Sequence, residues 1–259
     1  METSESLRTG RLSVVLPAYN EEESVPLAAD VIGNLLTRAG IDHELIFVND
    51  GSRDHTWRAI QEVAARRPQV RGIRFSRNFG KEAAIFAGLA QARGDCCVVL
   101  DCDLQHPPEK ILEMYSLWQQ GWQVVEGIKV SRGKESPLHT LAAKTFYRFL
   151  SGATRLDMSH ASDFKLLDRR AVDVLVAMRE KNAFFRALSS WIGFDTTQVE
   201  FEVQPRAAGQ SKWSLRSLTR YAVTNLAAFS TAPLQIVTIL GVLVFLCSLV
   251  LGCWSLWQK

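Results

Sequence analysis

The sequence predicts an α/β protein, in which a mostly parallel sheet carries helices on both faces and a membrane segment follows. Three observations support this class. Short apolar runs alternate with helix-length stretches along the first half of the chain, and this alternation is typical of right-handed strand–helix–strand units. A polar cluster follows each of the first four apolar runs. Residues 221–258 contain no charged side chain.

Length and composition are consistent with this class. The 259 residues, 47% of them hydrophobic and 22% charged, are enough for one sizeable core and an additional segment. The five cysteines include no Cys-x-x-Cys pair, and we expect them to be packing residues in a reducing compartment. The net charge is +3, and we expect no nucleic acid partner.

The first strand is expected at Leu12–Pro17, an apolar run that a proline ends. Asn20 then fits the N-cap of a helix that reaches about Ala39, with acidic residues in its first turn. The second strand is Glu44–Val48, and the helix after it extends to about Arg67. Both strands therefore end in polar loops that lead into helices.

The third strand, Val70–Phe75, precedes an alanine-rich helix that extends to about Ala92. The fourth strand, Cys96–Leu100, is uniformly apolar, as expected of a strand buried on both faces. A helix is expected at 109–120 and a strand at 124–127. A further helix is expected from residue 184 onward, and a last strand at 198–203.

Two carboxylates, Asp101 and Asp103, follow where the fourth strand must end. Side chains alternate along an extended backbone, so both would lie on one side and could converge on one point. Such a pair needs a cation, and hard oxygen ligands suit Mg²⁺ or Mn²⁺, which proteins commonly share with substrate phosphates. A solvated turn with two capping aspartates is the alternative. Ligands of parallel sheets bind outside the carboxyl ends of the strands, where Tyr19, Asp50 and Lys81 also fall.

The segment Leu234–Trp257 is nearly all apolar and longer than the roughly 20 residues with which a helix crosses a bilayer. We expect a transmembrane helix, with a buried core helix as the alternative. Residues 1–10 have no apolar core, so we expect no signal peptide. The chain contains no acidic residue after residue 202. Four basic residues precede the apolar span: Arg206, Lys212, Arg216 and Arg220. By the positive-inside rule, we expect this flank to face the cytoplasm. We therefore expect the N-terminal domain to be cytoplasmic, and we expect the membrane to be the inner membrane.

The same basic residues belong to an amphipathic pattern. Lys212, Arg216 and Arg220 are spaced four apart and share one helical face, whereas apolar residues share another. We expect a helix at the membrane interface, with a core-packed helix as the alternative. The expected organisation is a domain over 1–205, a juxtamembrane loop and interface helix over 206–232, and a transmembrane helix over 233–259.

Four segments resemble, in this order, the successive signatures of family 2 glycosyltransferases: 14–22, 48–56, 77–81 and 101–108. More narrowly, they are similar to polyprenyl-phosphate glycosyltransferases, the group of dolichol-phosphate mannose synthase and bacterial undecaprenyl-phosphate glucosyltransferases. The resemblance implies a GT-A fold and the inverting transfer of one sugar from a nucleoside diphosphate, with UDP favoured, to undecaprenyl phosphate. It also implies a metal-dependent enzyme of cell envelope glycan synthesis and is compatible with a homotetramer.

On the donor side, the resemblance assigns Pro17, Tyr19 and Glu21 to the nucleoside and Asp50 to the base. A tyrosine ring can stack on a base, and carboxylates accept hydrogen bonds from its N–H groups. Packing of Tyr19 and helix-dipole compensation by Glu21 are the alternatives. Lys81 is placed at the diphosphate as a point charge, or is a solvated lysine at a helix start.

The resemblance assigns the metal-binding stretch to Asp101, Asp103 and Gln105. The cation would bridge the donor diphosphate, to which Asp101 and Gln105 are also assigned, and would stabilise the charge on the leaving group. Asp103 is therefore counted with the catalytic residues.

On the acceptor side, residues 159–168 resemble the family's Gly-Asp-Phe-Arg-Leu stretch, whose aspartate is the usual candidate for the catalytic base. Asp163 takes that place, but Ser162 replaces the common glycine and Lys165 the common arginine. A phosphate monoester is largely ionised near neutral pH, so Asp163 can position the acceptor rather than remove a proton. His160 is the alternative base.

The lipid phosphate is expected to meet basic residues. Arg132 matches a recurrent arginine of the family, and residues 206–214 resemble its Arg-x-x-Gly-x-Ser-Lys-Trp/Tyr-Ser loop. That loop and the following helix supply four further contacts: Arg206, Ser211, Lys212 and Arg216.

Two other functions stay open. The first is a glycosyltransferase with a polysaccharide or protein acceptor, but a single span argues against the pore that a processive enzyme needs. The second is an inactive membrane adaptor that retains the fold, but the intact acidic residues argue against it.

Overall fold

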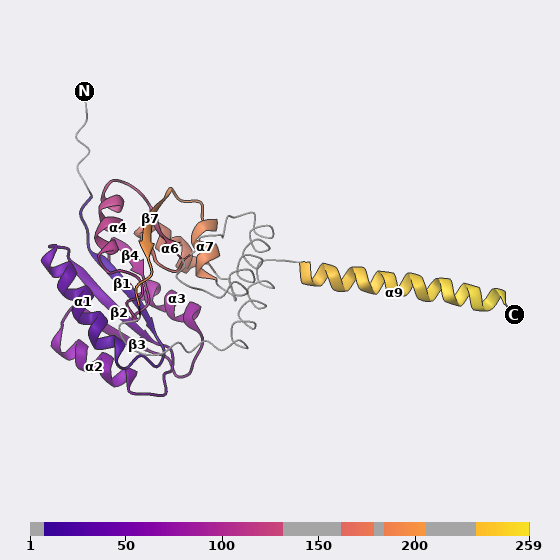
Figure 1. The fold of residues 1–259 in the computed structure, drawn as a ribbon, viewed down its shortest axis with the longest axis horizontal. Helices are drawn as coiled ribbons and strands as arrows, with labels where there is room; N and C mark the ends of the chain where they lie inside the picture. The colour runs from indigo at the N-terminus through magenta and orange to yellow at the C-terminus, as the bar shows by residue number, and fades with distance from the viewer. Residues whose placement is uncertain (1–7, 132–161, 179–183, 206–231, 259) are drawn as a thin grey trace, which may run out of the picture.

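The computed structural model describes residues 8–131, 162–178, 184–205 and 232–258. Within these ranges the chain forms a seven-stranded sheet in the order β3-β2-β1-β4-β6-β5-β7 (Figure 1). The strands are β1 (Leu12–Ala18), β2 (His43–Asn49), β3 (Val70–Arg74), β4 (Cys96–Val99), β5 (Val124–Ser131), β6 (Lys165–Asp168) and β7 (Thr196–Glu202). The helices are α1 (Ser24–Arg38), α2 (Thr56–Arg66), α3 (Lys81–Gln91), α4 (Lys110–Gln119), α6 (Arg169–Ala177), α7 (Phe185–Trp191) and α9 (Ala232–Trp257).

The sheet is mixed but mostly parallel, as the sequence predicted. β1 pairs in parallel with β2 and β4, and β2 pairs in parallel with β3. β6 runs antiparallel between β4 and β5, whereas β5 and β7 are parallel. The carboxyl ends of β1 to β4 therefore meet at one edge of the sheet, which is where ligands of such sheets bind.

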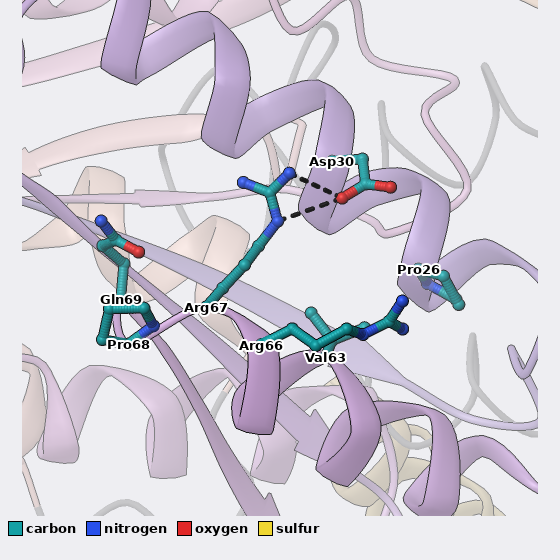
Figure 2. A pocket seen from close by; sticks show the side chains of 7 residues that line it. All are labelled: Pro26, Asp30, Val63, Arg66, Arg67, Pro68 and Gln69. Carbon is teal, nitrogen blue, oxygen red and sulfur yellow. Dashed lines mark hydrogen bonds and ion pairs between the residues drawn. The ribbon is translucent and has the colours of Figure 1, made fainter.

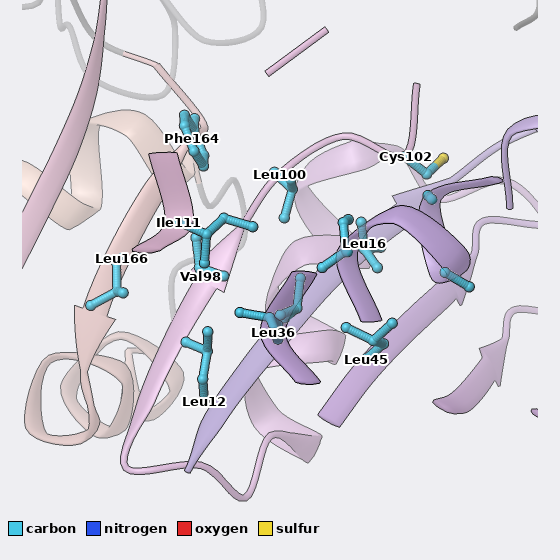
Figure 3. Close-up of a cluster of buried hydrophobic side chains, with 14 of the residues drawn as sticks. Leu12, Leu16, Leu36, Leu45, Val98, Leu100, Cys102, Ile111, Phe164 and Leu166 are labelled. Atoms are coloured by element: carbon cyan, nitrogen blue, oxygen red, sulfur yellow. The ribbon is translucent and has the colours of Figure 1, made fainter. Parts of the chain in front are cut away.

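Helices cover both faces of the sheet, because consecutive residues of its central strands are apolar on both sides. On one face, α1, α2 and α4 pack on a buried cluster that includes Leu16 and Val98 (Figure 3). On the other face, α3, α6 and α7 pack on a second cluster that includes Val15 and Val99. The cysteines of this region, Cys96, Cys97 and Cys102, are buried free thiols, which confirms their role in packing.

The prediction that Asn20 caps the first helix is wrong. α1 begins at Ser24 with Glu23 in the N-cap position. Asn20 has a φ of 54°, a left-handed conformation that asparagine tolerates. Its side-chain oxygen accepts a hydrogen bond of 2.8 Å from the backbone N–H of Arg53. Asn20 therefore joins the loops that follow β1 and β2.

β4 ends at Val99, earlier than predicted. Residues 102 and 103 form a turn, and Leu104 has a φ of 58°. The extended backbone from which the sequence placed Asp101 and Asp103 on one side is therefore absent, and the two carboxylates have different surroundings.

α9 is a 26-residue helix. Its segment Val237–Trp257 is the one candidate membrane span among the described residues, long and apolar enough to cross a bilayer. None of this segment is buried, so the alternative of a buried core helix is wrong.

Candidate active site

The loops after β1 and β2 are tied together at the carboxyl edge. The backbone N–H of Asn20 donates to Ser52 Oγ at 2.9 Å, and that of Glu21 donates to Thr56 Oγ1 at 2.7 Å. Glu21 Oε2 also accepts a hydrogen bond of 2.6 Å from Ser24 Oγ. Pro17 is buried in β1, opposite Val48 of β2, whereas Tyr19 and Glu21 are partly exposed at the edge. Their nucleoside role stays a prediction.

Asp50 holds the loop that leads into α3. Its carboxylate is 3% exposed and accepts hydrogen bonds from the backbone N–H of Phe79 at 2.7 Å, from that of Gly80 at 2.9 Å and from Asn78 Nδ2 at 2.9 Å. Burial raises the pKa of Asp50, and the two backbone hydrogen bonds oppose that rise. Gly51 is required beside it, because it has a φ of 63° and a Cβ there would collide with the Arg77 backbone. The carboxylate assigned to the nucleobase thus fixes the start of α3.

Lys81, the first residue of α3, bridges two carboxylates. Its Nζ lies 2.7 Å from Asp101 Oδ1 and 2.7 Å from Asp163 Oδ2. Burial alone would lower the pKa of Lys81, but Asp101 and Asp163 outweigh burial and raise the pKa above its ordinary value. The alternative of a solvated lysine is therefore wrong, and Lys81 joins the donor-side and acceptor-side candidates.

Asp163 also forms a bidentate ion pair with Arg186 of α7. Arg186 Nε donates to Oδ1 at 2.7 Å and Nη2 donates to Oδ2 at 2.9 Å. Burial opposes ionisation of Asp163, but Arg186 and Lys81 outweigh it and hold the pKa of this carboxyl well below its usual range. The sequence alone predicted no role for Arg186. The local sequence offers one indication of a role: Arg186 is a charged residue that directly follows two buried aromatic residues, Phe184 and Phe185.

Lys165, which replaces the family's arginine, points into the protein. It is 0% exposed, and its Nζ lies 2.7 Å from Glu126 Oε1 of β5. The same ammonium donates to Ser189 Oγ at 2.8 Å and to the backbone oxygen of Arg186 at 3.4 Å. Lys165 therefore anchors α7 to the sheet and does not face a phosphate. Ser162, in place of the glycine, accepts a hydrogen bond of 3.1 Å from the Phe164 backbone N–H.

The segment after β4 carries the three residues that the sequence assigned to a divalent cation, Asp101, Asp103 and Gln105. Burial would raise the pKa of Asp101, but the Lys81 ammonium outweighs burial and lowers that pKa. Asp103 is 5% exposed, and its Oδ1 accepts a hydrogen bond of 3.1 Å from the Gln105 backbone N–H. Among the described residues, no group of three or more His, Cys, Asp or Glu side chains could hold a metal ion alone. Donor oxygens would have to complete its coordination.

The His106 side chain packs beneath the segment after β4, against Phe164 of the segment before β6. Its ring stacks on Phe164, with 5.0 Å between ring centroids and 28° between planes. Burial lowers the pKa of His106, although Asp101 opposes the shift. Its Nδ1 is buried without a hydrogen-bond partner among the described residues. The stacked ring packs the segment that carries Asp103 against Phe164, the residue that follows Asp163.

The remaining predicted residues lie outside the described part of the chain. They are the five assigned to the lipid phosphate and the alternative base: Arg132, Arg206, Ser211, Lys212, Arg216 and His160. A hollow of about 480 Å³ lies elsewhere, between α1 and the end of α2 (Figure 2). Asp30 and Arg67, which form an ion pair of 2.7 Å, are part of its lining. It contains none of the predicted site residues.

The sequence of this chain is similar to those of known glycosyltransferases. The family model described as glycosyl transferase family 2 matches residues 13–175. The chain is 39% identical over 232 residues to the uncharacterised glycosyltransferase YkcC of Bacillus subtilis, covering 89% of this chain and 72% of that one. It is 34% identical over 247 residues to the bactoprenol glucosyl transferase of Shigella phage SfV, covering 95% and 80%.

Solved structures have the same fold. Mannosyl-3-phosphoglycerate synthase from Rubrobacter xylanophilus superposes with a TM-score of 0.62 at 18% identity, covering 85% of this chain and 72% of that one. Glucosyl-3-phosphoglycerate synthase from Mycobacterium tuberculosis, solved with Mn²⁺, UDP-glucose and phosphoglyceric acid, gives 0.57 at 22% identity, covering 85% and 79%. The fold is therefore of the GT-A type. Because the family model spans more than half of the sequence, from β1 to α6, this chain belongs to glycosyl transferase family 2.

Proposed function

We propose that this glycosyltransferase moves a single sugar, with inversion, from a UDP-sugar to a polyprenyl phosphate such as undecaprenyl phosphate. The observation that carries the proposal is a row of alternating charges at the carboxyl edge: Asp101, Lys81, Asp163 and Arg186. Carboxylates suit a metal that a diphosphate shares, and a guanidinium suits a phosphate. Both substrates of the proposed reaction are phosphorylated, so one row of charges serves both.

The donor side rests on the turn after β4 and on Lys81. Asp101, Asp103 and Gln105 would hold Mg²⁺ or Mn²⁺, which would stabilise the departing nucleoside diphosphate. Lys81 lies beside Asp101 and would contact the diphosphate as a point charge. The Mycobacterium tuberculosis synthase of the same fold was solved with UDP-glucose and Mn²⁺, which supports UDP as the nucleotide and a divalent metal as the cofactor.

The acceptor side rests on α9 and on the relatives. A polyprenyl phosphate lies in a bilayer, and α9 supplies a span long enough to hold the enzyme there. The similarity to proteins named bactoprenol glucosyl transferase supports a polyprenyl acceptor. We infer that the enzyme lies in the cytoplasmic membrane with its catalytic domain in the cytoplasm. It would serve cell envelope glycan synthesis, and a homo-oligomer remains compatible with this arrangement.

Transfer of labelled sugar tests the proposal. Detergent-solubilised full-length protein is incubated with a panel of UDP- and GDP-sugars and Mn²⁺ or Mg²⁺. Parallel reactions contain undecaprenyl phosphate, 3-phosphoglycerate or no acceptor. We expect label in organic-extractable lipid only with undecaprenyl phosphate, one UDP-sugar and a divalent metal.

Two variants make this assay specific. Asp103→Asn should abolish the lipid product. Asp195→Asn should retain it, because Asp195 is exposed and precedes β7 at the opposite edge of the sheet. Product on 3-phosphoglycerate, or free sugar without transfer, would reject the polyprenyl acceptor. Equal product from Asp103→Asn would reject the assigned metal site.

A further inference from the structure

Asp163 is poorly placed to remove a proton from an acceptor. Its side chain is 3% exposed, and both oxygens are paired: Oδ1 with Arg186 at 2.7 Å, and Oδ2 with Arg186 at 2.9 Å and Lys81 at 2.7 Å. A carboxylate between two cations is also a weak base. A phosphate monoester carries most of its negative charge at pH 7, so the proposed reaction does not require a base at this position.

The two cations face the solvent side of the cluster. The side chains of Lys81 and Arg186 are 27% and 23% exposed, whereas that of Asp163 is 3% exposed. Asp101 also pairs with Lys81, so the four side chains carry no net charge, and Arg186 is the cation that Asp101 does not share. An anion that approaches this part of the site therefore meets the ammonium and the guanidinium before it meets the carboxylate.

Arg186 is held in place from its backbone as well as from its side chain. Lys165 Nζ donates to the Arg186 backbone oxygen at 3.4 Å and to the hydroxyls of Ser189 and Ser190 at 2.8 Å and 3.2 Å. The charge of Lys165 is balanced by Glu126, 2.7 Å away. The first turn of α7 is thus fixed to β5 and β6.

A second link sets Arg186 relative to Lys81. Glu82, the neighbour of Lys81, accepts a hydrogen bond of 2.8 Å from the backbone N–H of Phe185, the neighbour of Arg186. The starts of α3 and α7 are therefore joined directly. A guanidinium fixed in this way would bind a phosphate with little further loss of conformational entropy.

We propose that Arg186 binds the phosphate of the acceptor and that Asp163 is a positioning residue, which holds Arg186 and Lys81 for that task. This inference rests on the proposed function. An ionised phosphate oxygen of the acceptor attacks the anomeric carbon and forms the new C–O bond. The bond from that carbon to the diphosphate oxygen breaks, and its electron pair leaves with UDP. No proton is transferred to Asp163.

Steady-state kinetics test the role of Arg186. In Arg186→Gln, the KM for undecaprenyl phosphate should rise about 10- to 100-fold, the range for a charge-assisted hydrogen bond. The KM for the UDP-sugar should stay within about twofold, because Asp101, which is assigned to the donor, lies on the other side of Lys81 from Asp163 and Arg186. Arg186→Lys should recover part of the loss, since charge remains but the fork is gone. Arg58→Gln is the matched control, because Arg58 is 76% exposed on α2.

Asp163→Asn separates a positioning residue from a base. We expect the same increase in acceptor KM as in Arg186→Gln, and we expect the double variant to be no worse than either single variant, because both act through one contact. A variant whose kcat falls at an unchanged acceptor KM would instead identify Asp163 as a base and overturn the proposal. A wild-type acceptor KM in Arg186→Gln would also overturn it.

Binding of farnesyl phosphate distinguishes failure of this inference from failure of the proposed function. Calorimetry on the solubilised full chain should detect farnesyl phosphate but not farnesol, and Arg186→Gln should weaken this binding at least 10-fold. If the wild type makes no lipid product yet shows this difference, the proposed function fails and the phosphate site stands. If farnesyl phosphate binds both proteins equally, or binds neither, the phosphate site is rejected. Thermal unfolding of each variant verifies that it is folded.

Discussion

Lys81 and Asp163 form an ion pair of 2.7 Å, although Lys81 begins α3 and Asp163 precedes β6. The pair forms because β6 lies beside β4 in the sheet, which brings the segment before β6 to the edge where β4 ends. Asp101, at that end of β4, is the other partner of Lys81. A single ammonium thus joins the candidate metal stretch to the candidate acceptor residue.

Replacement of Lys81 should reduce transfer without unfolding the protein. In Lys81→Met, we expect kcat/KM for the UDP-sugar to fall about 100-fold, as for the loss of one charge-stabilising donor. Folding should persist, because Asp163 keeps Arg186 and Asp101 is partly exposed. Lys110→Met is the matched control, since Lys110 also begins a helix but pairs only with the exposed Glu113 in the described structure. Equal activity of both variants would show that Lys81 is dispensable.

Replacement of Lys165 should destabilise the fold. In Lys165→Met, the Glu126 carboxylate, 13% exposed, loses its cation, and we expect a loss of about 3–5 kcal/mol in the free energy of unfolding. Urea denaturation measures this loss. The double variant Lys165→Met/Glu126→Gln should recover part of it, because no buried charge is then left unpaired. A loss below about 1 kcal/mol in the single variant would show that solvent reaches Glu126.

The parallel part of the fold was predictable because its information is local. Each of the first four strands is a short apolar run that ends in polar residues, and the parallel order then puts Lys81 and Asp101 at one edge. Asp163 was assigned to the same site from the resemblance of residues 159–168 to a motif of the family. The sequence could not show that Lys81 would touch both carboxylates, because that contact depends on where β6 inserts.

The antiparallel strand β6 and the role of Arg186 were missed for a different reason. β6 is only Lys165–Asp168, and a buried lysine and a buried aspartate hide its apolar centre. Its pairing with β4 spans about seventy residues of sequence. Arg186 becomes interpretable only when α7 is placed beside α3. The alternation argument for Asp101 and Asp103 failed because β4 ends at Val99.

Asp50→Asn tests whether this carboxylate holds the α3 loop. The amide can accept from the N–H groups of Phe79 and Gly80 with one atom only, so we expect a loss of about 1–3 kcal/mol in stability. Because the loop positions Lys81, kcat for transfer should fall as well. Thermal unfolding and kinetics measure the two effects. Unchanged stability with a switch between UDP- and GDP-sugars would instead assign Asp50 to the nucleobase. Asp54→Asn, in the neighbouring loop, is a comparison variant.

Removal of residues 232–259 tests the anchoring role of α9. Since none of the span is buried, the shortened protein should keep its unfolding temperature and its response to UDP and Mn²⁺. After a carbonate wash of the membranes, the shortened protein should be found in the supernatant, because a span of this length supplies most of the membrane affinity. Retention in the membrane pellet would assign the anchor to residues 206–231.

Asp163 should contribute to stability in a pH-dependent way. Burial would raise its pKa, but Arg186 and Lys81 outweigh burial and hold the pKa well below 3.8, the ordinary value expected in the unfolded chain. Since the folded pKa is the lower one, the unfolded state binds more protons in the interval between the two values, and stability there increases with pH. The contribution of Asp163 is therefore complete above about pH 4 and is lost as the pH falls toward the folded pKa.

Unfolding of the wild type and of Asp163→Asn, compared from about pH 2.5 to 6, should show a stability difference that shrinks below about pH 4. The exposed control Asp195→Asn should show a small difference at every pH, and a pH-independent difference for Asp163→Asn would mean that this carboxyl is not ionised in the folded protein.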